Sequence, residues 1–246
     1  MSLYASSYVP AVSSARQLLE THPACAALVG EEMTPERLER FLIEYTARAV
    51  KLTEPVDGWI RRAGAATRAA GLESLGAQLE AHAKHEAGHH LMLIDDARNL
   101  AARWNARGDV PPVDVEALLA APPTPATQAY VDLHEETIAS PAPYGQVAIE
   151  LEIEGLSVRF GPPLMQRVEA LLGREVLDKL TFITEHVEVD AGHTALNEKM
   201  MARLLADRPD ALEDLVRIGR AALEIYVRFF EECLTAADAA RSGSAA

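Results

Sequence analysis

Apolar residues recur along most of the chain at the three-to-four-residue spacing of amphipathic helices, and proline or glycine separates each such stretch from the next. Thr34 and Pro35 are the cap and first-turn residues of a typical helix start, and Pro55 interrupts the run that follows. We expect further helices over about 13–21, 56–70, 73–106, 113–121, 125–138, 174–205 and 210–240. The pattern predicts an all-α protein.

One stretch, Val147–Phe160, instead alternates apolar and polar residues with the period of a strand. No other stretch offers it a convincing strand partner, and an isolated hairpin is marginal in water. We therefore predict a helix here. In that helix Glu150 and Glu154 share one face, while Glu152 points elsewhere.

Composition favours a single helical domain. The 246 residues are 49% hydrophobic but only 5% aromatic, with abundant alanine and leucine, which is typical of packed helices rather than of a sandwich or barrel. We expect one domain over residues 1–246, with an ordered core over about 11–240. The short N-terminal segment and the C-terminal tail are small and polar, so we expect them to be loose and to carry no chemistry.

Charge and cysteine content exclude several classes of partner. A net charge of −14 argues against binding to nucleic acid or an anionic membrane surface. No apolar stretch approaches the roughly 18 residues of a membrane span, and the N-terminal residues lack the pattern of a secretory signal. Cys25 and Cys233 are the only cysteines, so there is no disulfide framework. We expect a soluble, cytoplasmic protein.

Candidate chemistry is concentrated in two copies of one pattern, His-x3-acid-x2-His. The copies are His82, Glu86, His89 and His186, Asp190, His193. Six of the eight histidines lie in these two segments, at positions 82, 85, 89, 90, 186 and 193. On one helix, this spacing brings the three side chains of a copy onto one face. Two imidazoles and a carboxylate suit non-haem iron, and two such faces suggest two metal ions.

Gly88 and Gly192 occupy the same position in both copies, although glycine inside a helix costs about 1 kcal/mol relative to alanine. Tight helix packing or the close approach of a substrate to the backbone would offset that cost. Zinc fits the histidines less well because structural zinc sites favour cysteine, and calcium and magnesium need oxygen-rich shells. Iron or manganese remains, and Glu154 or Glu150 is the obvious source of a further carboxylate.

Several segments resemble the haem-oxygenase-like di-iron oxidases and oxygenases: EAGH at 86–89, IEG at 153–155, HVEVDAGH at 186–193 and the opening stretch 22–50. The resemblance spans about residues 20–235 and implies a seven-helix bundle around two iron ions. The metal ligands that it implies are Glu86, His89, Glu154, His186, Asp190 and His193. Glu86 and His89 would belong to one iron and the second copy mostly to the other, with Glu154 bridging or capping. The roles of His82 and Glu150 stay open, and His85 and His90 are expected beside the ligands.

The resemblance also implies an O2-dependent oxidoreductase. Its expected reaction is C–H abstraction from a small, amino-acid-like substrate, leading to desaturation, cyclisation or oxidative fragmentation in a biosynthetic pathway. N-oxygenation of an amine and decarboxylative cleavage of a fatty acid are alternatives. An external electron donor, an electron-transfer protein partner and a homodimer are left open. We expect a small, polar pocket with few aromatic residues, and Arg159 is a candidate anchor for the substrate.

Other protein classes would use the same residues differently. A ferritin-like di-iron bundle would combine the two acid-x2-His pairs with Glu154 and either Glu44 or Glu54. A metal-free, thiaminase-II-like enzyme would need a nucleophilic cysteine in the central cavity, whereas Cys25 and Cys233 lie in the first and last helical segments. A non-catalytic haem protein is disfavoured by the acidic charge, since haem propionates usually bind basic residues.

Overall fold

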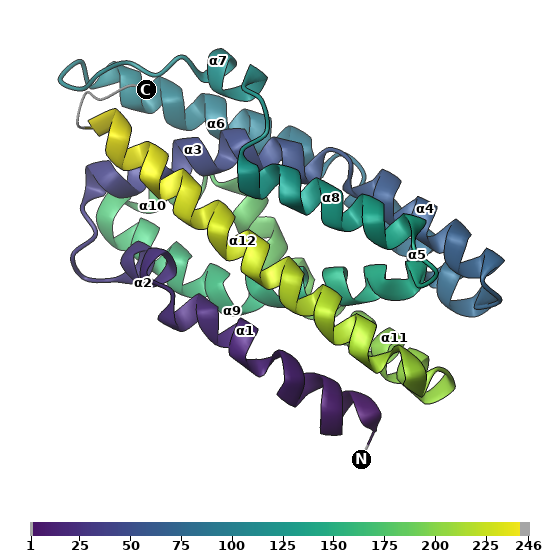
Figure 1. Ribbon diagram of the computed structural model, residues 1–246. Helices are drawn as coiled ribbons and strands as arrows, with labels where there is room; N and C mark the ends of the chain where they lie inside the picture. Colours follow the sequence, from purple (N-terminus) through teal and green to yellow (C-terminus); the bar gives the residue numbers. More distant parts are fainter. Residues whose placement is uncertain (1, 242–246) are drawn as a thin grey trace.

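In the computed structural model, which describes residues 2–241, every regular element is a helix (Figure 1). The principal helices are α1 (Val9–Thr21), α2 (Pro23–Val29), α3 (Pro35–Thr53), α4 (Val56–Ala69), α5 (Glu73–Glu86), α6 (His89–Ala106), α7 (Val115–Ala120), α8 (Pro125–Ala139), α9 (Gln146–Leu172), α10 (Arg174–Leu177), α11 (Thr181–Asp207) and α12 (Leu212–Arg241). A π-helical turn, Tyr4–Tyr8, precedes α1, and short 3-10 turns, Pro143–Gly145 and Pro209–Ala211, precede α9 and α12. The predicted all-α class is confirmed.

The long helices run along one direction of an elongated bundle, with α12 crossing in front of α9 (Figure 1). Helices α3 and α4 form one kinked rod, interrupted at Pro55, and α5 and α6 form a second rod that returns beside it, so that α4 packs on α5 and α3 on α6. Helix α9 packs against α11 and α12. The predicted number of seven helices is too low for the described residues, because breaks divide the long rods and short helices lie between them.

Local sequence explains several helix boundaries. The Thr34 hydroxyl accepts a hydrogen bond from the backbone N–H of Arg37 at 3.3 Å, and Pro35 occupies the first turn of α3, as predicted. The stretch with strand-like alternation is helical, which confirms the prediction for 147–160. It continues to Leu172 through the adjacent prolines at 162 and 163. Burial on most sides of α9 explains why its sequence lacks a clean helical period.

The predicted single helix over 73–106 is wrong. Helix α5 ends at Glu86, and α6 begins at His89 after Gly88, whose φ of 90° is left-handed. A residue in that conformation cannot continue a right-handed helix. The first copy of the pattern therefore spans two helices. The predicted helix over 174–205 also begins with the separate short helix α10, and α11 starts at Thr181.

The N-terminal segment is ordered, contrary to the prediction. The side chain of Tyr8 is fully buried, and its hydroxyl donates a hydrogen bond to Oε1 of Glu152 at 3.1 Å. Arg16 also binds this buried carboxylate, with distances of 2.7 and 2.8 Å. Glu152 thus points away from Glu150 and Glu154, as predicted, and fastens the N-terminal helices to α9. Residues 242–246 of the predicted loose tail lie outside the described residues.

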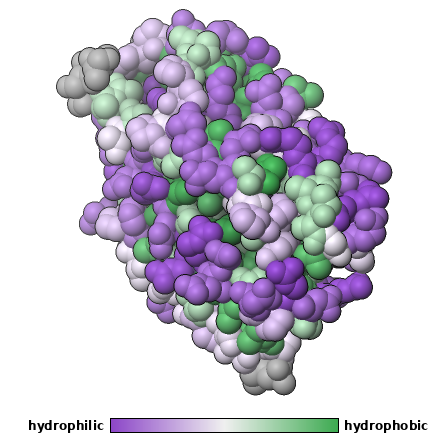
Figure 2. All heavy atoms as spheres, turned by 45° about the vertical axis from the view of Figure 1, so that its right-hand side comes forward, coloured by the Kyte–Doolittle hydropathy of each residue, from purple (hydrophilic) through white to green (hydrophobic). Residues whose placement is uncertain are grey.

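The surface is mainly polar. Figure 2 shows hydrophilic residues over most of one face, with hydrophobic residues in scattered places between them. The apolar side chains of the long helices instead form one continuous core. Within residues 2–241, no helix combines the length and apolar character needed to cross a membrane.

Candidate metal centre

Two groups of histidine and carboxylate side chains meet where α5, α6, α9 and α11 face one another. The first group is His82, Glu86, Glu154 and His193, and the second is Glu86, His89 and His186. In each group, one potential ligand atom from every residue lies within 4.8 Å of all the others. Glu86 belongs to both groups. The two groups are therefore adjacent and have one carboxylate in common.

Three buried polar atoms of the first group have no hydrogen-bond partner among the described residues: Nε2 of His82, Oε1 of Glu154 and Nδ1 of His193. Nε2 of His82 lies 2.9 Å from Oε1 of Glu154, and Nδ1 of His193 lies 3.6 Å from the same oxygen, without hydrogen-bond geometry. Unsatisfied buried polar atoms are costly. A cation between these converging lone pairs would remove that cost, so the donor set fits a metal ion.

In the second group, a backbone carbonyl of α11 orients His186. Nδ1 of His186 lies 2.7 Å from the carbonyl oxygen of Phe182, to which it can donate a hydrogen bond, leaving Nε2 as the free ring nitrogen. The rings of His186 and His89 lie 4.7 Å apart, nearly perpendicular. Nδ1 of His89 lies 3.1 Å from Oε2 of Glu86. Potential ligand atoms of the two imidazoles and of the shared carboxylate thus lie within 4.8 Å of one another.

The buried carboxylate of Asp96, on α6, fixes the start of α11. It accepts hydrogen bonds from the backbone N–H groups of Thr181 and Phe182, at 3.1 and 3.0 Å, and from the Thr181 hydroxyl at 2.8 Å. These N–H groups have no partner within their own helix, so Asp96 serves as its cap from another helix. It positions the turn that bears His186.

Asp190 and Glu150 lie beside the two groups. Asp190 accepts a short hydrogen bond from the Ser157 hydroxyl, and its Oδ1 lies 3.6 Å from Nδ1 of His193. Oε1 of Glu150 accepts a hydrogen bond from the amide of Gln146 at 2.5 Å, and its Oε2 lies 3.7 Å from Nε2 of His82. Of the six predicted ligands, Asp190 alone falls outside both groups. The geometry adds His82 to the first.

A cavity of about 110 Å3 borders these residues. The carboxylate and imidazole side chains on its wall are those of Glu86, Glu150, Glu154, His186 and Asp190. Most of the remaining wall is apolar or aromatic, formed by Tyr45, Leu52, Val56, Tyr130, Ile153, Leu156, Phe160, Leu164, Phe182, Ile183, Val187, Tyr226 and Phe230. No lysine or arginine of the described residues lines it.

The expected polar pocket with few aromatic residues is therefore wrong. Aromatic residues from α3, α8, α9, α11 and α12 converge on the cavity although these helices are distributed over most of the sequence. Arg159, the candidate substrate anchor, does not line it. Its guanidinium lies 3.7 Å from Oε2 of Glu152, on the opposite side of α9 from the metal-binding groups.

Comparison with known proteins identifies the family. A family model described as an iron-containing redox enzyme matches residues 41–227. The chain belongs to this family. A search of curated proteins finds no match. The chain is also similar to a crystal structure from Shewanella denitrificans OS217, described as a domain of unknown function with a heme oxygenase-like fold. The TM-score is 0.76, with 16% identity, over 96% of this chain and 94% of that one.

The comparisons confirm the haem-oxygenase-like fold and the family that the sequence resembles. The protein is thus an iron-containing redox enzyme, and its histidine and carboxylate groups are the candidate site for that iron.

Without metal, burial and the closely spaced carboxylates of the site shift the pKa values of several of its side chains. Burial raises the pKa of Glu154 to about 8, with nearby Glu150 and Asp190 acting in the same direction. Burial likewise raises the pKa of Asp190 to about 7. Burial lowers the pKa of His82, but the carboxylates of Glu150 and Glu154 outweigh it and raise that pKa to about 11. Without metal, His82 is therefore protonated at neutral pH, and its positive charge offsets the negative charge of Glu150 and Glu154. A bound metal ion would take over this role.

The structure supports neither the ferritin-like metal site nor the metal-free, cysteine-dependent site. Glu44 pairs with Arg40 and Arg48 on its own helix, and Glu54 is exposed at the end of α3. A ferritin-like site would need one of these carboxylates. Cys25 and Cys233 are buried away from the cavity wall, so neither can serve as the nucleophile of a thiaminase-II-like enzyme.

Two residues that bind the carboxylates of the site, Ser157 and Asn197, were not predicted from the sequence. Ser157 binds Asp190, and the amide of Asn197 donates a short hydrogen bond to Oε2 of Glu154. Ser157 lies three residues after Glu154 and Asn197 four after His193, so helical spacing was the available signal. His85, on the exposed side of α5, has its ring 5.7 Å from that of His193 and stays beside the ligands.

Proposed function

We propose that the protein is a non-haem di-iron oxidase or oxygenase that uses O2 to oxidise C–H bonds in an apolar part of a small substrate. The main support for two iron ions is that Glu86 is common to two adjacent ligand groups. A carboxylate with two oxygens can bind one ion through each, which suits a pair of metals better than one.

The proposed ligands combine residues from both copies of the pattern at each iron. His82, Glu154 and His193 would hold one ion, His89 and His186 the other, and Glu86 both. This grouping differs from the expected one, in which each copy served mainly its own iron. Asp190, held by Ser157, would add a carboxylate beside His193. Glu86 and Glu154 would offset half of the charge of two ferrous ions, and Asp190 would raise that share.

When bound, the iron pair would supply the electrons for reducing O2 and the oxidising power for attack on a C–H bond. The protein's own residues orient and shield the reactants. The phenylalanine and leucine side chains of the cavity exclude water and hold a hydrocarbon group beside Glu86 and Asp190. The hydrogen bonds of Asp96 and of the Phe182 carbonyl keep His186 in place.

The cavity supports a substrate that presents hydrocarbon rather than charge. An amino-acid-like substrate with an apolar side chain in a biosynthetic pathway remains our proposal, because that side chain suits the apolar and aromatic residues of the wall. The aliphatic chain of a fatty acid would suit the same wall. N-oxygenation would instead place the reacting amine beside the carboxylates of the cavity and would make no use of its apolar wall.

Iron loading and reaction with O2 test this function. Metal-free protein loaded anaerobically with ferrous iron is expected to retain two ions per chain, and O2 should convert them to a coupled ferric pair in the Mössbauer spectrum. His186→Ala should lower the iron content, whereas Glu54→Ala, at the exposed end of α3, should not. Iron content well below one per chain, or loss of iron in the Glu54 variant alone, would contradict the proposal.

A further inference from the structure

A column of three buried rings leads away from the cavity. Tyr130 lines the cavity wall, and its ring lies 4.6 Å from that of His134, one turn further along α8. His134 in turn stacks on Trp59 of α4, with centroids 4.1 Å apart and planes 10° from parallel. The rings of Tyr130 and Trp59 are themselves 6.2 Å apart. The three rings are in contact without a break.

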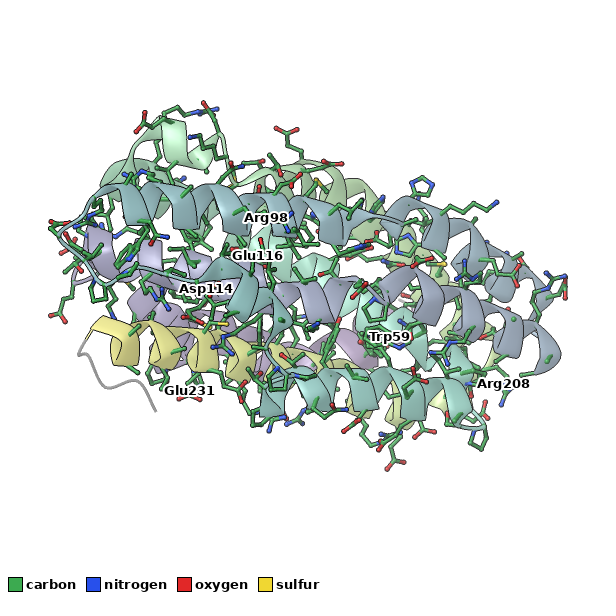
Figure 3. The ribbon with its side chains drawn as sticks, turned by 90° about the horizontal axis from the view of Figure 1, so that it is seen from above. Trp59, Arg98, Asp114, Glu116, Arg208 and Glu231 are labelled. Atoms are coloured by element: carbon green, nitrogen blue, oxygen red, sulfur yellow. The ribbon has the colours of Figure 1, made fainter. Side chains whose placement is uncertain are left out.

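The outer end of this column reaches a carboxylate in contact with solvent. The ring of Trp59 lies in the interior between α4 and α8 (Figure 3) and is 2% exposed. Its Nε1–H donates a hydrogen bond to Oε1 of Glu135 at 2.9 Å. The Glu135 side chain is 48% exposed and pairs with Arg62. The indole N–H thus has a proton acceptor in place at the edge of the protein.

The middle of the column is held in a neutral form. Nδ1 of His134 lies 3.0 Å from the Gln146 amide nitrogen, and that amide also donates to Glu150. Burial lowers the pKa of His134 to about 3, so the ring carries no charge at neutral pH. A neutral ring between Tyr130 and Trp59 adds no electrostatic barrier to positive charge on either of them.

We propose that Trp59 is an internal one-electron donor to the iron centre, connected to it through His134 and Tyr130. This inference rests on the proposed function, because O2 must first oxidise the iron. Trp59 then loses one electron, which reduces the oxidised centre by one equivalent, and its Nε1 proton passes to Oε1 of Glu135. A neutral indole radical remains. The route operates when no substrate is present to supply the electron.

The physical basis is the redox chemistry of the side chains involved. Tryptophan and tyrosine lose one electron more readily than other uncharged side chains, and electron transfer is fast between aromatic groups in contact. Loss of an electron makes the indole N–H far more acidic, so a carboxylate within hydrogen-bond distance of Nε1 makes the oxidation easier. Trp59 combines both features: a ring column that ends at the cavity and an acceptor for its proton.

Trp104 provides a matched control within the chain, which contains two tryptophans. It is also buried, and its N–H donates a hydrogen bond at 2.9 Å, but to the backbone carbonyl of Pro111, which cannot take the proton. The guanidinium of Arg107 lies 5.3 Å from its ring centroid, where a positive charge opposes loss of an electron. Trp104 does not line the cavity.

Electron paramagnetic resonance tests the proposal. Iron-loaded protein is mixed with O2 in the absence of substrate and frozen within milliseconds to seconds. We expect an organic radical whose spectrum narrows when tryptophan deuterated on the indole ring is incorporated, but not when ring-deuterated tyrosine is. The signal should be lost in Trp59→Phe and retained in Trp104→Phe. After repeated cycles, peptide mass spectrometry should find oxygen added at Trp59 and not at Trp104.

Several outcomes would overturn the inference. A radical that responds to labelled tyrosine, or one of equal yield in Trp59→Phe, would place the donor elsewhere. Iron oxidised by O2 with no organic radical and no modified Trp59 would reject the donor while leaving the proposed function intact. Iron that O2 fails to oxidise would reject the proposed function itself. If Trp59→Phe does not fold or load iron, isotope labelling and peptide mapping of the unmodified protein still decide.

Discussion

The shared carboxylate of Glu86 is the residue on which the di-iron proposal depends most. Glu86→Gln should remove ligands from both groups, whereas His186→Ala affects the second group alone. We therefore expect iron content to fall from two per chain to well below one in the glutamine variant, and to about one in the alanine variant. Elemental analysis measures both.

Glu80→Gln, one to two turns earlier on the same helix, is the control for Glu86→Gln. Glu80 pairs with Arg68 near the surface and lies outside both groups, so its variant should keep the full iron content. Equal losses in the two glutamine variants would point to damage to α5 rather than to a shared ligand.

His134 provides a test of electrostatics away from the metal ligands. Its pKa is about 3 in the folded protein, against 6.5 for the free side chain, because the ring is buried. Below pH 6.5 the unfolded chain binds a proton that the folded chain does not, so the stability from this residue falls as pH decreases. Between pH 8 and pH 5 the loss should be about 2 kcal/mol.

Denaturant unfolding of the wild-type protein and of His134→Phe, at a series of pH values, measures this loss. Phenylalanine keeps a ring against Trp59 but cannot titrate. The comparison is needed because the raised pKa values of Glu154 and Asp190 act in the opposite direction, increasing metal-free stability as pH falls. Parallel pH dependences in the two proteins would refute the buried, neutral state of His134.

At the scale of elements, the two copies of the pattern differ in their backbone. Gly88 has a φ of 90° between α5 and α6, whereas Gly192 lies within the continuous helix α11, and a Cβ atom at either position meets no atom within 4 Å. Gly88→Ala should therefore destabilise the protein by about 1–2 kcal/mol through backbone strain.

Gly192→Ala should instead stabilise the protein by up to about 1 kcal/mol, because alanine favours a helix more than glycine does.

Thermal unfolding with and without iron measures both glycine variants. Gly88→Ala should also reduce iron content, because it moves His89 relative to Glu86. A destabilising effect of Gly192→Ala similar to that of Gly88→Ala would show that the two positions are equivalent after all, as their matching place in the sequence suggested.

This contrast marks what the sequence could predict about elements. Spacing correctly brought Glu150 and Glu154 to one face of α9, because helical geometry fixes which side chains align. It failed at Gly88, because the same residue type is compatible with a regular helix and with a left-handed break. It also failed at Tyr8, whose burial depends on the distant carboxylate of Glu152 rather than on its neighbours.

At the scale of the whole molecule, the sequence was enough to predict the types of metal ligand. It was not enough to predict which side chains form the cavity. Clustered histidines in two copies indicated iron from a local pattern, and the family confirms an iron-containing redox enzyme. The wall of the cavity, by contrast, combines side chains such as Tyr45, Phe160 and Phe230 from three helices. Amphipathic periodicity tells which face of a helix is apolar, but not which faces meet or where they leave space.

The apolar wall predicts discrimination between ligands that have the same number of side-chain carbons. L-norleucine and L-lysine share a four-carbon side chain, but lysine ends in an ammonium group that would lose its hydration against the apolar and aromatic side chains that form most of the wall. Norleucine should raise the melting temperature of the anaerobic, iron-loaded protein, by an amount equivalent to about 2.7 kcal/mol at 100 times its Kd. Lysine at the same concentration should have no such effect, and hexanoate separates the contribution of the amino group. Stronger stabilisation by lysine would instead indicate that the carboxylates near the metals bind an amine, which would favour N-oxygenation.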